Sequence, residues 1–322
     1  MRSSRIGGVS DGSSEAPLTD AAAKLRREAE RHDRAARAGS LREAQGQRER
    51  RHWAPSAGEA LILAAALLVA VVMVYPTAWV FFASFKTQET LFSGEFAAYT
   101  LRNYARLLGS GFGVHVVNSL GICLMAVTVS TFVSVLAAYV FSRMRFRWKS
   151  WLFGAVMLGQ TFPWIVLVTP VFILFARLGL LNSYVGIVFC YVAVTIPFSV
   201  YLLVGYLESV PRSLDETAII DGCPRFQVIW RIVFPIMLPG VVATATYSFL
   251  LCWSEYLFAL AFLTRTEMKT MPLALYAFFG EHTTEWGQVM AASALITLPT
   301  LLLFLPLQTK LTAGLAAGSV KQ

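Results

Sequence analysis

The chain has 322 residues, of which 56% are apolar and only 14% are charged. Because soluble domains carry about 25% charged residues, this composition excludes an ordinary soluble enzyme, a secreted disulfide scaffold and a soluble nucleic-acid binder, and it indicates a protein that crosses a membrane several times. The net charge is +8, and residues 1–51 account for half of it with 12 basic and 8 acidic side chains.

Residues 1–52 contain no long apolar run. They are rich first in Ser and Gly and then in Ala, Arg and Glu, and they offer little apolar surface to offset the entropy of ordering. The first apolar run starts too late for a cleavable signal peptide. We therefore expect residues 1–52 to be a disordered or loosely helical cytoplasmic tail, and residues 53–322 to be a transmembrane domain.

Six apolar runs follow the tail, and each reaches the ~20 residues that a helix needs to cross a hydrocarbon core. Continuous runs of this length are typical of helices, which satisfy their own backbone hydrogen bonds in lipid. The predicted fold is an all-α polytopic membrane protein. Prolines 163, 170 and 197 predict kinks along a pathway or are simply tolerated. The predicted spans are approximately 59–85, 113–141, 151–176, 184–207, 235–263 and 289–309.

The distribution of basic residues between the spans predicts the orientation. With both termini inside, 21 of the 27 Lys and Arg residues lie on the inner side. Inner loops of membrane proteins carry such an excess of positive charge. The sequence therefore predicts six spans with both termini in the cytoplasm.

Motifs for metal, redox or nucleotide chemistry are absent from the sequence. The four cysteines have no C-x-x-C spacing, and the four histidines are scattered. No G-x-x-x-x-G-K-[ST] stretch is present, so we expect no ATP bound by a P-loop of this chain. We predict neither a catalytic residue nor a metal site.

The inner loop 208–234, between the fourth and fifth spans, contains signals for two short helices. Ser213 and Glu216 have the spacing of a capping box, which predicts a helix that starts near Leu214. Gly222 suits the left-handed position that ends it. Pro224 fits the first turn of a second helix.

The second predicted helix carries an apolar stripe at helical spacing, formed by Phe226, Ile229, Trp230 and Val233. A helix–Gly–helix hairpin with an apolar and mixed-charge surface is suited to dock on another protein. A connector that only packs beneath its own bundle would fit the same pattern.

These residues also carry a family resemblance. The stretch Glu216-Thr-Ala-Ile-Ile-Asp-Gly222, followed by nine residues and then Ile232-Val-Phe-Pro235, resembles the E-A-A-x3-G-x9-I-x-L-P signature of binding-protein-dependent ABC importer permeases. Thr217 and Phe234 depart from the signature, at positions that tolerate such changes.

Flanking segments are similar to the maltose-type second permease subunit, in the carbohydrate branch of this family. The resemblance covers roughly residues 59–322, whereas the tail 1–52 is not part of the family pattern. The segments are Asn118-Ser119-Leu120, Leu136-Ala-Ala-Tyr139, Phe141-Ser-Arg143, Trp253-Ser-Glu255-Tyr-Leu-Phe258, Leu311-Thr-Ala-Gly314 and Gly318-Ser-Val-Lys321.

The resemblance implies a non-catalytic permease subunit in a bacterial inner membrane. Its expected partners are a second permease subunit, two ATPase subunits that use Mg-ATP, and an extracytoplasmic solute-binding protein, with no cofactor bound by this chain. The family's hairpin inserts into an ATPase subunit and couples ATPase closure to alternating access. That coupling role is carried over to Glu216, Ala218, Asp221, Gly222, Arg225 and Phe226.

A translocation pathway needs polar groups at membrane depth, where they are costly unless functional or paired. Glu255 is the only acidic residue well inside a predicted span, and an aromatic face next to a carboxylate suits a sugar. Alternatively, Glu255 caps or hydrogen-bonds a neighbouring helix, or belongs to an outer gate. The candidate pathway residues are Asn118, Gln160, Thr161, Trp253, Glu255 and Tyr256.

The sequence thus favours a permease subunit of an ATP-driven sugar importer. The same machine for another solute, such as glycerol phosphate or a polyamine, is an alternative, although the span interiors lack the Lys and Arg that a phosphate ester would favour. A stand-alone channel or a membrane enzyme would need a pore-lining repeat or a catalytic constellation, and the sequence contains neither.

Overall fold

The computed structural model describes residues 57–93, 99–279 and 284–319, so the predicted tail 1–52 lies outside the described residues. Within these ranges every regular element is a helix, in agreement with the predicted all-α class. The described residues fall into two units, divided between Val74 and Tyr75. Helix α2 (Ala57–Ser84) begins in the first unit and ends in the second.

Helix α2 occupies the first predicted span. It is 28 residues long, and none of its residues before Ala83 is buried. Its large apolar side chains are exposed, for example Leu61 and Met73 at 72% each. Apolar exposure on this scale is unsuited to water and suits contact with lipid or another membrane helix.

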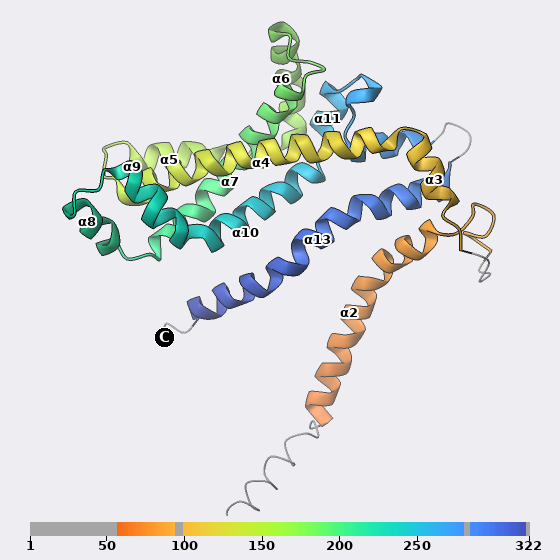
Figure 1. Ribbon diagram of the computed structural model, residues 1–322, viewed down its shortest axis with the longest axis horizontal. Coiled ribbons are helices and arrows are strands. Elements are labelled where there is room, and N and C mark those ends of the chain that lie inside the picture. Colours follow the sequence, from red (N-terminus) through yellow and green to blue (C-terminus); the bar gives the residue numbers. More distant parts are fainter. Residues whose placement is uncertain (1–56, 94–98, 280–283, 320–322) are drawn as a thin grey trace, which may run out of the picture. The chain divides into compact units, whose positions relative to one another are not determined.

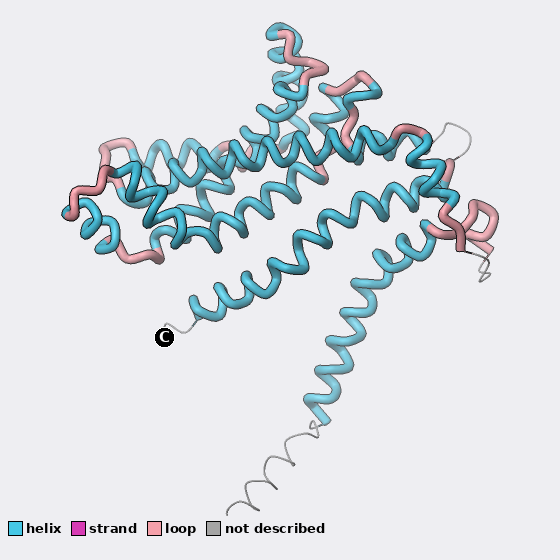
Figure 2. Tube along the Cα trace, viewed as in Figure 1, coloured by secondary structure: helices cyan, strands magenta, loops and turns pink. Residues whose placement is uncertain are grey.

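The second unit is built around helix α4 (Phe112–Arg143), which packs along α7 (Tyr184–Glu208) and α10 (Phe234–Trp253) (Figure 1). Helix α13 (Trp286–Ser319) contacts α10 and the short helix α3 (Arg102–Gly109). Figure 2 shows that helices account for nearly all of the described chain, with short connections between them.

Buried apolar side chains form two clusters along α4. The first contains Ile187 and Trp253, and the second contains Leu203 and Val228. Buried hydroxyls also lie in the bundle, and Ser199 Oγ lies 3.0 Å from Ser248 Oγ. Small residues let membrane helices approach closely, and such hydroxyl pairs join them without a large polar group.

The third predicted span, 151–176, is interrupted near Pro163, one of the positions at which the sequence predicts a kink. The chain forms α5 (Lys149–Leu158) and then α6 (Trp164–Leu178), separated by residues 159–163. Pro163 is extended, with φ −61° and ψ 125°. Proline lacks an N–H and disfavours a helical residue before it, which accounts for the break.

The fifth predicted span, 235–263, is also divided. Helix α10 ends at Trp253, and α11 (Leu257–Phe262) follows after a short break. In contrast, Pro170 and Pro197 lie inside α6 and α7 without ending them. Three short helices lead towards α13, namely η2 (Thr266–Met268), α12 (Met271–Leu275) and η3 (Tyr276–Phe278).

Five helices in the described part of the chain are long and apolar enough to cross a membrane. They lie in the first, second, fourth, fifth and sixth predicted spans, and α5 and α6 are shorter apolar helices. The five are Ala57–Ser84, Phe112–Arg143, Tyr184–Glu208, Arg225–Trp253 and Trp286–Leu305.

Candidate functional site: the hairpin between α7 and α10

The hairpin (residues 208–234) contains two short helices, α8 (Ser213–Ile220) and α9 (Arg225–Val228), as the sequence predicted. A π-helical segment, η1 (Ile229–Val233), joins α9 to α10. Figure 1 shows α8 and α9 at the end of the bundle where α4 and α7 finish. The hairpin is therefore continuous with the bundle through η1 and α10.

The turn between α8 and α9 is built as predicted around Gly222, which has φ +81°. The Gly222 N–H donates to the carbonyl of Ile219 at 3.1 Å, and the Cys223 N–H donates to that of Ala218 at 3.0 Å. This pair of bonds is the Schellman motif, which satisfies the last carbonyls of a helix. Because a side chain is disfavoured at positive φ, glycine suits this turn. Pro224 then precedes α9 as its N-cap residue, one position before the predicted place.

The predicted capping box is wrong. Helix α8 begins at Ser213 itself, its N-cap residue is Arg212 in a helical conformation, and no side chain caps it. The Glu216 N–H donates to the carbonyl of Arg212 at 3.1 Å, as in an ordinary helical turn. Because Ser213 is already helical, its hydroxyl is not placed to reach the N–H three residues ahead. Glu216 therefore has no capping role and is exposed.

The predicted apolar stripe is correct for Ile229 and Val233, which are 9% and 1% exposed. Trp230 is half-buried, and it stacks on Phe132 of α4 with ring centroids 5.5 Å apart. Phe226 departs from the prediction because it is 67% exposed, whereas Val228 is fully buried. Phe226 lies in the first turn of α9, next to the exposed turn at Gly222, where little of the bundle is available to cover it.

The six residues predicted for ATPase coupling lie together on α8, its turn and the start of α9. Only Ala218 is buried, at 6% exposure, and it belongs to the second core cluster. The other five are exposed, namely Glu216, Asp221, Gly222, Arg225 and Phe226. Exposed Ile220, at 84%, extends this surface. Ala218 thus holds α8 on the bundle, while the exposed residues form a surface that can receive a partner.

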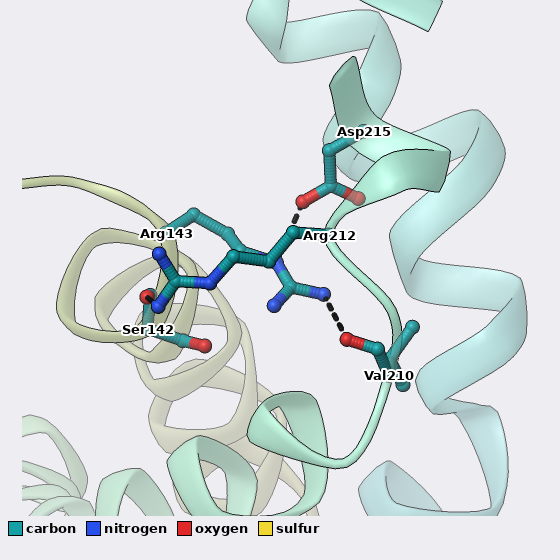
Figure 3. Close-up of polar contacts among 5 residues, drawn as sticks. All are labelled: Ser142, Arg143, Val210, Arg212 and Asp215. Atoms are coloured by element: carbon teal, nitrogen blue, oxygen red, sulfur yellow. Dashed lines mark hydrogen bonds and ion pairs between the residues drawn. The ribbon is translucent and has the colours of Figure 1, made fainter. Parts of the chain in front are cut away.

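An ion pair that the sequence did not predict fixes α8. Nε of Arg143, at the end of α4, lies 2.6 Å from Oδ2 of Asp215 (Figure 3). Asp215 precedes Ala218 by three residues, so the two share the buried face of α8. That spacing indicated which face of α8 is buried, but no local signal named Arg143 as its partner.

A pocket of about 200 Å³ lies beside this ion pair. Its lining combines four arginines with two acidic side chains, so it is a charged hollow between the end of α4 and the hairpin. The lining residues are Tyr139, Arg143, Met144, Arg145, Arg212, Asp215, Glu216, Ile219 and Arg225.

Among the predicted pathway residues, Glu255 is buried at 8% exposure. Its carboxylate accepts the N–H of Phe258 at 2.8 Å, the N–H of Ala259 at 3.2 Å and the hydroxyl of Tyr191 at 2.9 Å. The first two bonds cap the start of α11. The structure thus contains the capping and helix-joining arrangement that the sequence left as an alternative for Glu255.

Trp253 and Tyr256 flank Glu255. The Trp253 indole N–H donates to the carbonyl of Ile296 at 2.9 Å, and its ring stacks on Phe249. Tyr256 is half-buried. The indole N–H of Trp253 and both carboxylate oxygens of Glu255 are therefore engaged within the bundle.

The remaining pathway candidates lie elsewhere. Asn118 donates to the carbonyls of Glu267 and Lys269 at 2.8 and 3.1 Å. Gln160 and Thr161 are exposed in the break between α5 and α6. The six candidates thus lie in three different places, the start of α4, the α5–α6 break and the α10–α11 break.

Two further cavities are relevant to a solute. A cavity of about 10 Å³ beside Glu255 is too small for a sugar. Another of about 560 Å³, lined by apolar residues of α6, α7 and α11, includes none of the six pathway candidates. In the described residues, no group of three or more His, Cys, Asp or Glu side chains could hold a metal ion.

An all-helical chain with several spanning-length apolar helices and an exposed hairpin is a polytopic membrane protein. Residues 130–315 match the family described as "Binding-protein-dependent transport system inner membrane component". The chain belongs to this family, and it is a transport subunit of the inner membrane.

Curated relatives share most of the chain. It is 34% identical over 268 residues to the trehalose/maltose transport system permease protein MalG of Thermococcus litoralis, covering 81% of this chain and 96% of the relative. It is 31% identical over 261 residues to the diacetylchitobiose uptake system permease protein DasC of Streptomyces coelicolor, covering 80% and 95%.

A solved structure supports the fold. A chain of a bacterial ABC transporter involved in the import of the acidic polysaccharide alginate aligns with a TM-score of 0.68 at 21% identity, covering 80% of this chain and 98% of that one. The predicted family and the predicted class of transport protein are confirmed by these comparisons.

Proposed function

We propose that this chain is one of two permease subunits of an ATP-driven sugar importer, and that its hairpin couples the ATPase subunits to the membrane helices. The observation that carries the proposal is the hairpin itself. It combines a Schellman turn at Gly222, a buried anchoring face at Ala218 and Asp215, and an exposed surface. An element that transmits force needs such a rigid attachment on one side and an accessible contact on the other.

A cross-linking experiment tests the contact with the ATPase. Ile220→Cys places a thiol on the exposed surface of α8. In the purified complex of this chain with its second permease and two ATPase subunits, we expect a bifunctional cross-linker to join position 220 to an ATPase subunit. A matched thiol at Val117→Cys, which is also exposed but lies on α4, should give no such product. A product at position 117 and none at position 220 would contradict the proposal.

The sugar class follows from the relatives, which are named for trehalose, maltose and diacetylchitobiose. The test is calorimetric binding of solutes by the cognate solute-binding protein. The panel consists of these three sugars, glycerol 3-phosphate and a polyamine. Binding of a sugar alone supports the proposal, whereas binding of only glycerol 3-phosphate or the polyamine would assign the importer to another solute.

We propose six membrane crossings with both termini in the cytoplasm, with α5 and α6 together making the third. The excess of basic residues on the hairpin side supports this orientation. Alkaline phosphatase fused after Lys310 should be inactive, since that enzyme requires the oxidising exterior, and a fluorescent protein fused at the same place should be bright. The reverse result would contradict the topology.

For the pathway, we propose that Gln160 and Thr161 face the solute, since both are exposed at a break between two apolar helices. Non-helical backbone at membrane depth is tolerated where it lines a cavity or lies against protein. Gln160 Nε2 also donates to the carbonyl of Val194 at 3.2 Å, which holds this side chain at the break. Asn118, Trp253 and Glu255, whose side chains bond within the bundle, then shape the pathway together with the half-buried Tyr256.

A further inference from the structure

The end of α4 and the hairpin are joined by two arginines that reach in opposite directions (Figure 3). From α4, Arg143 contacts Asp215 through Nε and donates through Nη2 to the carbonyl of Val210 at 2.9 Å. From the hairpin, Arg212 donates to the carbonyl of Ser142 at 2.9 Å. Three polar contacts therefore connect α4 to the short connection between α7 and α8 and to α8 itself.

The ion pair within this group is buried, with the Arg143 and Asp215 side chains 6% and 7% exposed. Separating a buried pair leaves uncompensated charge, which strongly opposes its opening. The covalent connection between α7 and α8 is only residues 209–212. Apart from the ion pair, the contacts of α8 are mainly with α9 and η1, which belong to the hairpin itself.

At its other end, α4 is attached to the segment between α11 and α12. The Asn118 amide donates to the carbonyl of Glu267, and His115 Nδ1 lies 3.0 Å from the carbonyl of Lys269. Ser119 Oγ accepts the N–H of Met271 at 2.7 Å. Helix α4 has 32 residues and is therefore about 48 Å long at 1.5 Å per residue. It joins the hairpin to a segment at the far end of the bundle.

We propose that Arg143 is a positioning residue for transport. Through Asp215 it makes the hairpin and α4 move as one body, so that a displacement of α8 by the ATPase reaches residues 267–271 instead of being absorbed in the connection 209–212. This inference rests on the proposed coupling function of the hairpin, and it adds the residue that attaches the hairpin to α4.

Electron paramagnetic resonance distances test the rigid attachment. Spin labels are placed at Leu214→Cys on α8 and Val117→Cys near the start of α4, both of which are exposed. Cys223→Ser removes the one native thiol that is not buried. The complete complex in lipid nanodiscs is measured without nucleotide and after trapping with Mg-ATP and vanadate.

With Arg143 present, we expect the 117–214 distance to be the same in both states. In Arg143→Met we expect the mean distance to shift on trapping by more than the width of the original distribution. The matched control is Arg147→Met, which removes an exposed arginine from the next connection and should leave the distance unchanged. The exchanged pair, Arg143→Asp with Asp215→Arg, should reduce the shift seen in Arg143→Met.

If Arg143→Met fails to assemble, Arg143→Lys provides a second test, since it keeps a positive charge but cannot maintain both the Asp215 and Val210 contacts with the same geometry. We expect it to give a smaller shift. Two results would overturn the inference. One is a 117–214 distance that does not change on trapping in any assembled Arg143 variant, and the other is a shift on trapping that is equally large when Arg143 is present. If one of these results is found while position 220 still cross-links to an ATPase subunit, only the role of Arg143 is contradicted. If the cross-link at position 220 is missing, the proposed coupling function itself is contradicted.

Discussion

The hydroxyl of Tyr191 on α7 donates a hydrogen bond of 2.9 Å to Oε2 of Glu255, which lies just beyond the end of α10. The same carboxylate caps α11 through the N–H groups of Phe258 and Ala259. One buried acidic residue thus joins α7 to the segment at which the fifth predicted span is broken.

From this relationship we predict that Glu255→Ala destabilises the bundle. Its removal leaves the Tyr191 hydroxyl and two N–H groups without an acceptor, and each buried unsatisfied group costs about 1–3 kcal/mol. We expect a lower melting temperature for the purified complex, measured by size-exclusion chromatography after heating. Glu255→Gln keeps one acceptor oxygen, so its melting temperature should fall between those of the unchanged complex and Glu255→Ala.

Glu267→Gln is the control for Glu255, since the Glu267 side chain is exposed and the Asn118 contact uses only its backbone carbonyl. It should leave the melting temperature unchanged. Normal stability of Glu255→Ala together with lost sugar uptake would favour direct solute contact over the capping role.

The turn at Gly222 gives a second prediction. Gly222→Pro removes the N–H that donates to Ile219 and imposes a φ near −65°, against the observed +81°. We expect the complex to assemble and hydrolyse ATP while uptake is lost, because the turn of the hairpin is distorted. The ratio of solute transported to ATP hydrolysed in proteoliposomes measures this uncoupling.

Gly222→Asn is the matched variant, since asparagine tolerates the left-handed conformation better than other residues with a side chain. It should retain most of the coupling ratio. Unchanged transport by Gly222→Pro would count strongly against a coupling role for this turn.

The buried face of α8 gives a third prediction. Ala218→Leu adds three carbon atoms at a site that is 6% exposed, and overpacking of this kind costs about 1–3 kcal/mol. We expect α8 to be displaced from the bundle, with a lower melting temperature and an increased rate of proteolysis within residues 208–234. The control is Thr217→Ala at an exposed position of α8, which should change neither the melting temperature nor the rate of proteolysis. Equal behaviour of the two variants would contradict the packing role of Ala218.

A fourth prediction concerns the pathway. Thr161 and Thr128 are both exposed, and each hydroxyl bonds to a carbonyl in its own segment, of Leu158 and Leu124 respectively. Because an intramolecular hydrogen bond contributes about 0.5–1.5 kcal/mol, a lost contact to a sugar hydroxyl should raise the KM for uptake by up to about tenfold. We expect this in Thr161→Val and in Gln160→Ala.

Thr128→Val should leave KM unchanged, since Thr128 lies on α4 away from the α5–α6 break. Normal KM values for both Gln160→Ala and Thr161→Val would remove these residues from the proposed pathway.

The sequence by itself determined the helical class, the places of the apolar helices and the two-helix form of the hairpin. These features depend on local physics. Length and apolar content set a membrane helix, and Gly222 provides the backbone freedom for the turn. The resemblance to the E-A-A-type signature also located the hairpin.

Other features depended on neighbours that the sequence does not place. The helix at 151–176 is broken at Pro163 but continues through Pro170, and an apolar run gives no sign of that difference. Glu216 lost its predicted capping role because α8 starts at Ser213, one position earlier than the capping pattern requires. The first residue of a helix is hard to predict because a capped start and a start one residue earlier differ little, and helix ends vary by one or two residues.

Only the tertiary structure decided which polar residues are partners. Arg143 and Asp215 are 72 positions apart, and Tyr191 and Glu255 are 64 apart, so no helical or turn periodicity connects them. Burial makes these partners obligatory, since a charge or carboxylate without one is costly in a low-dielectric interior. The sequence therefore located the hairpin, and the packed bundle determined how it is attached.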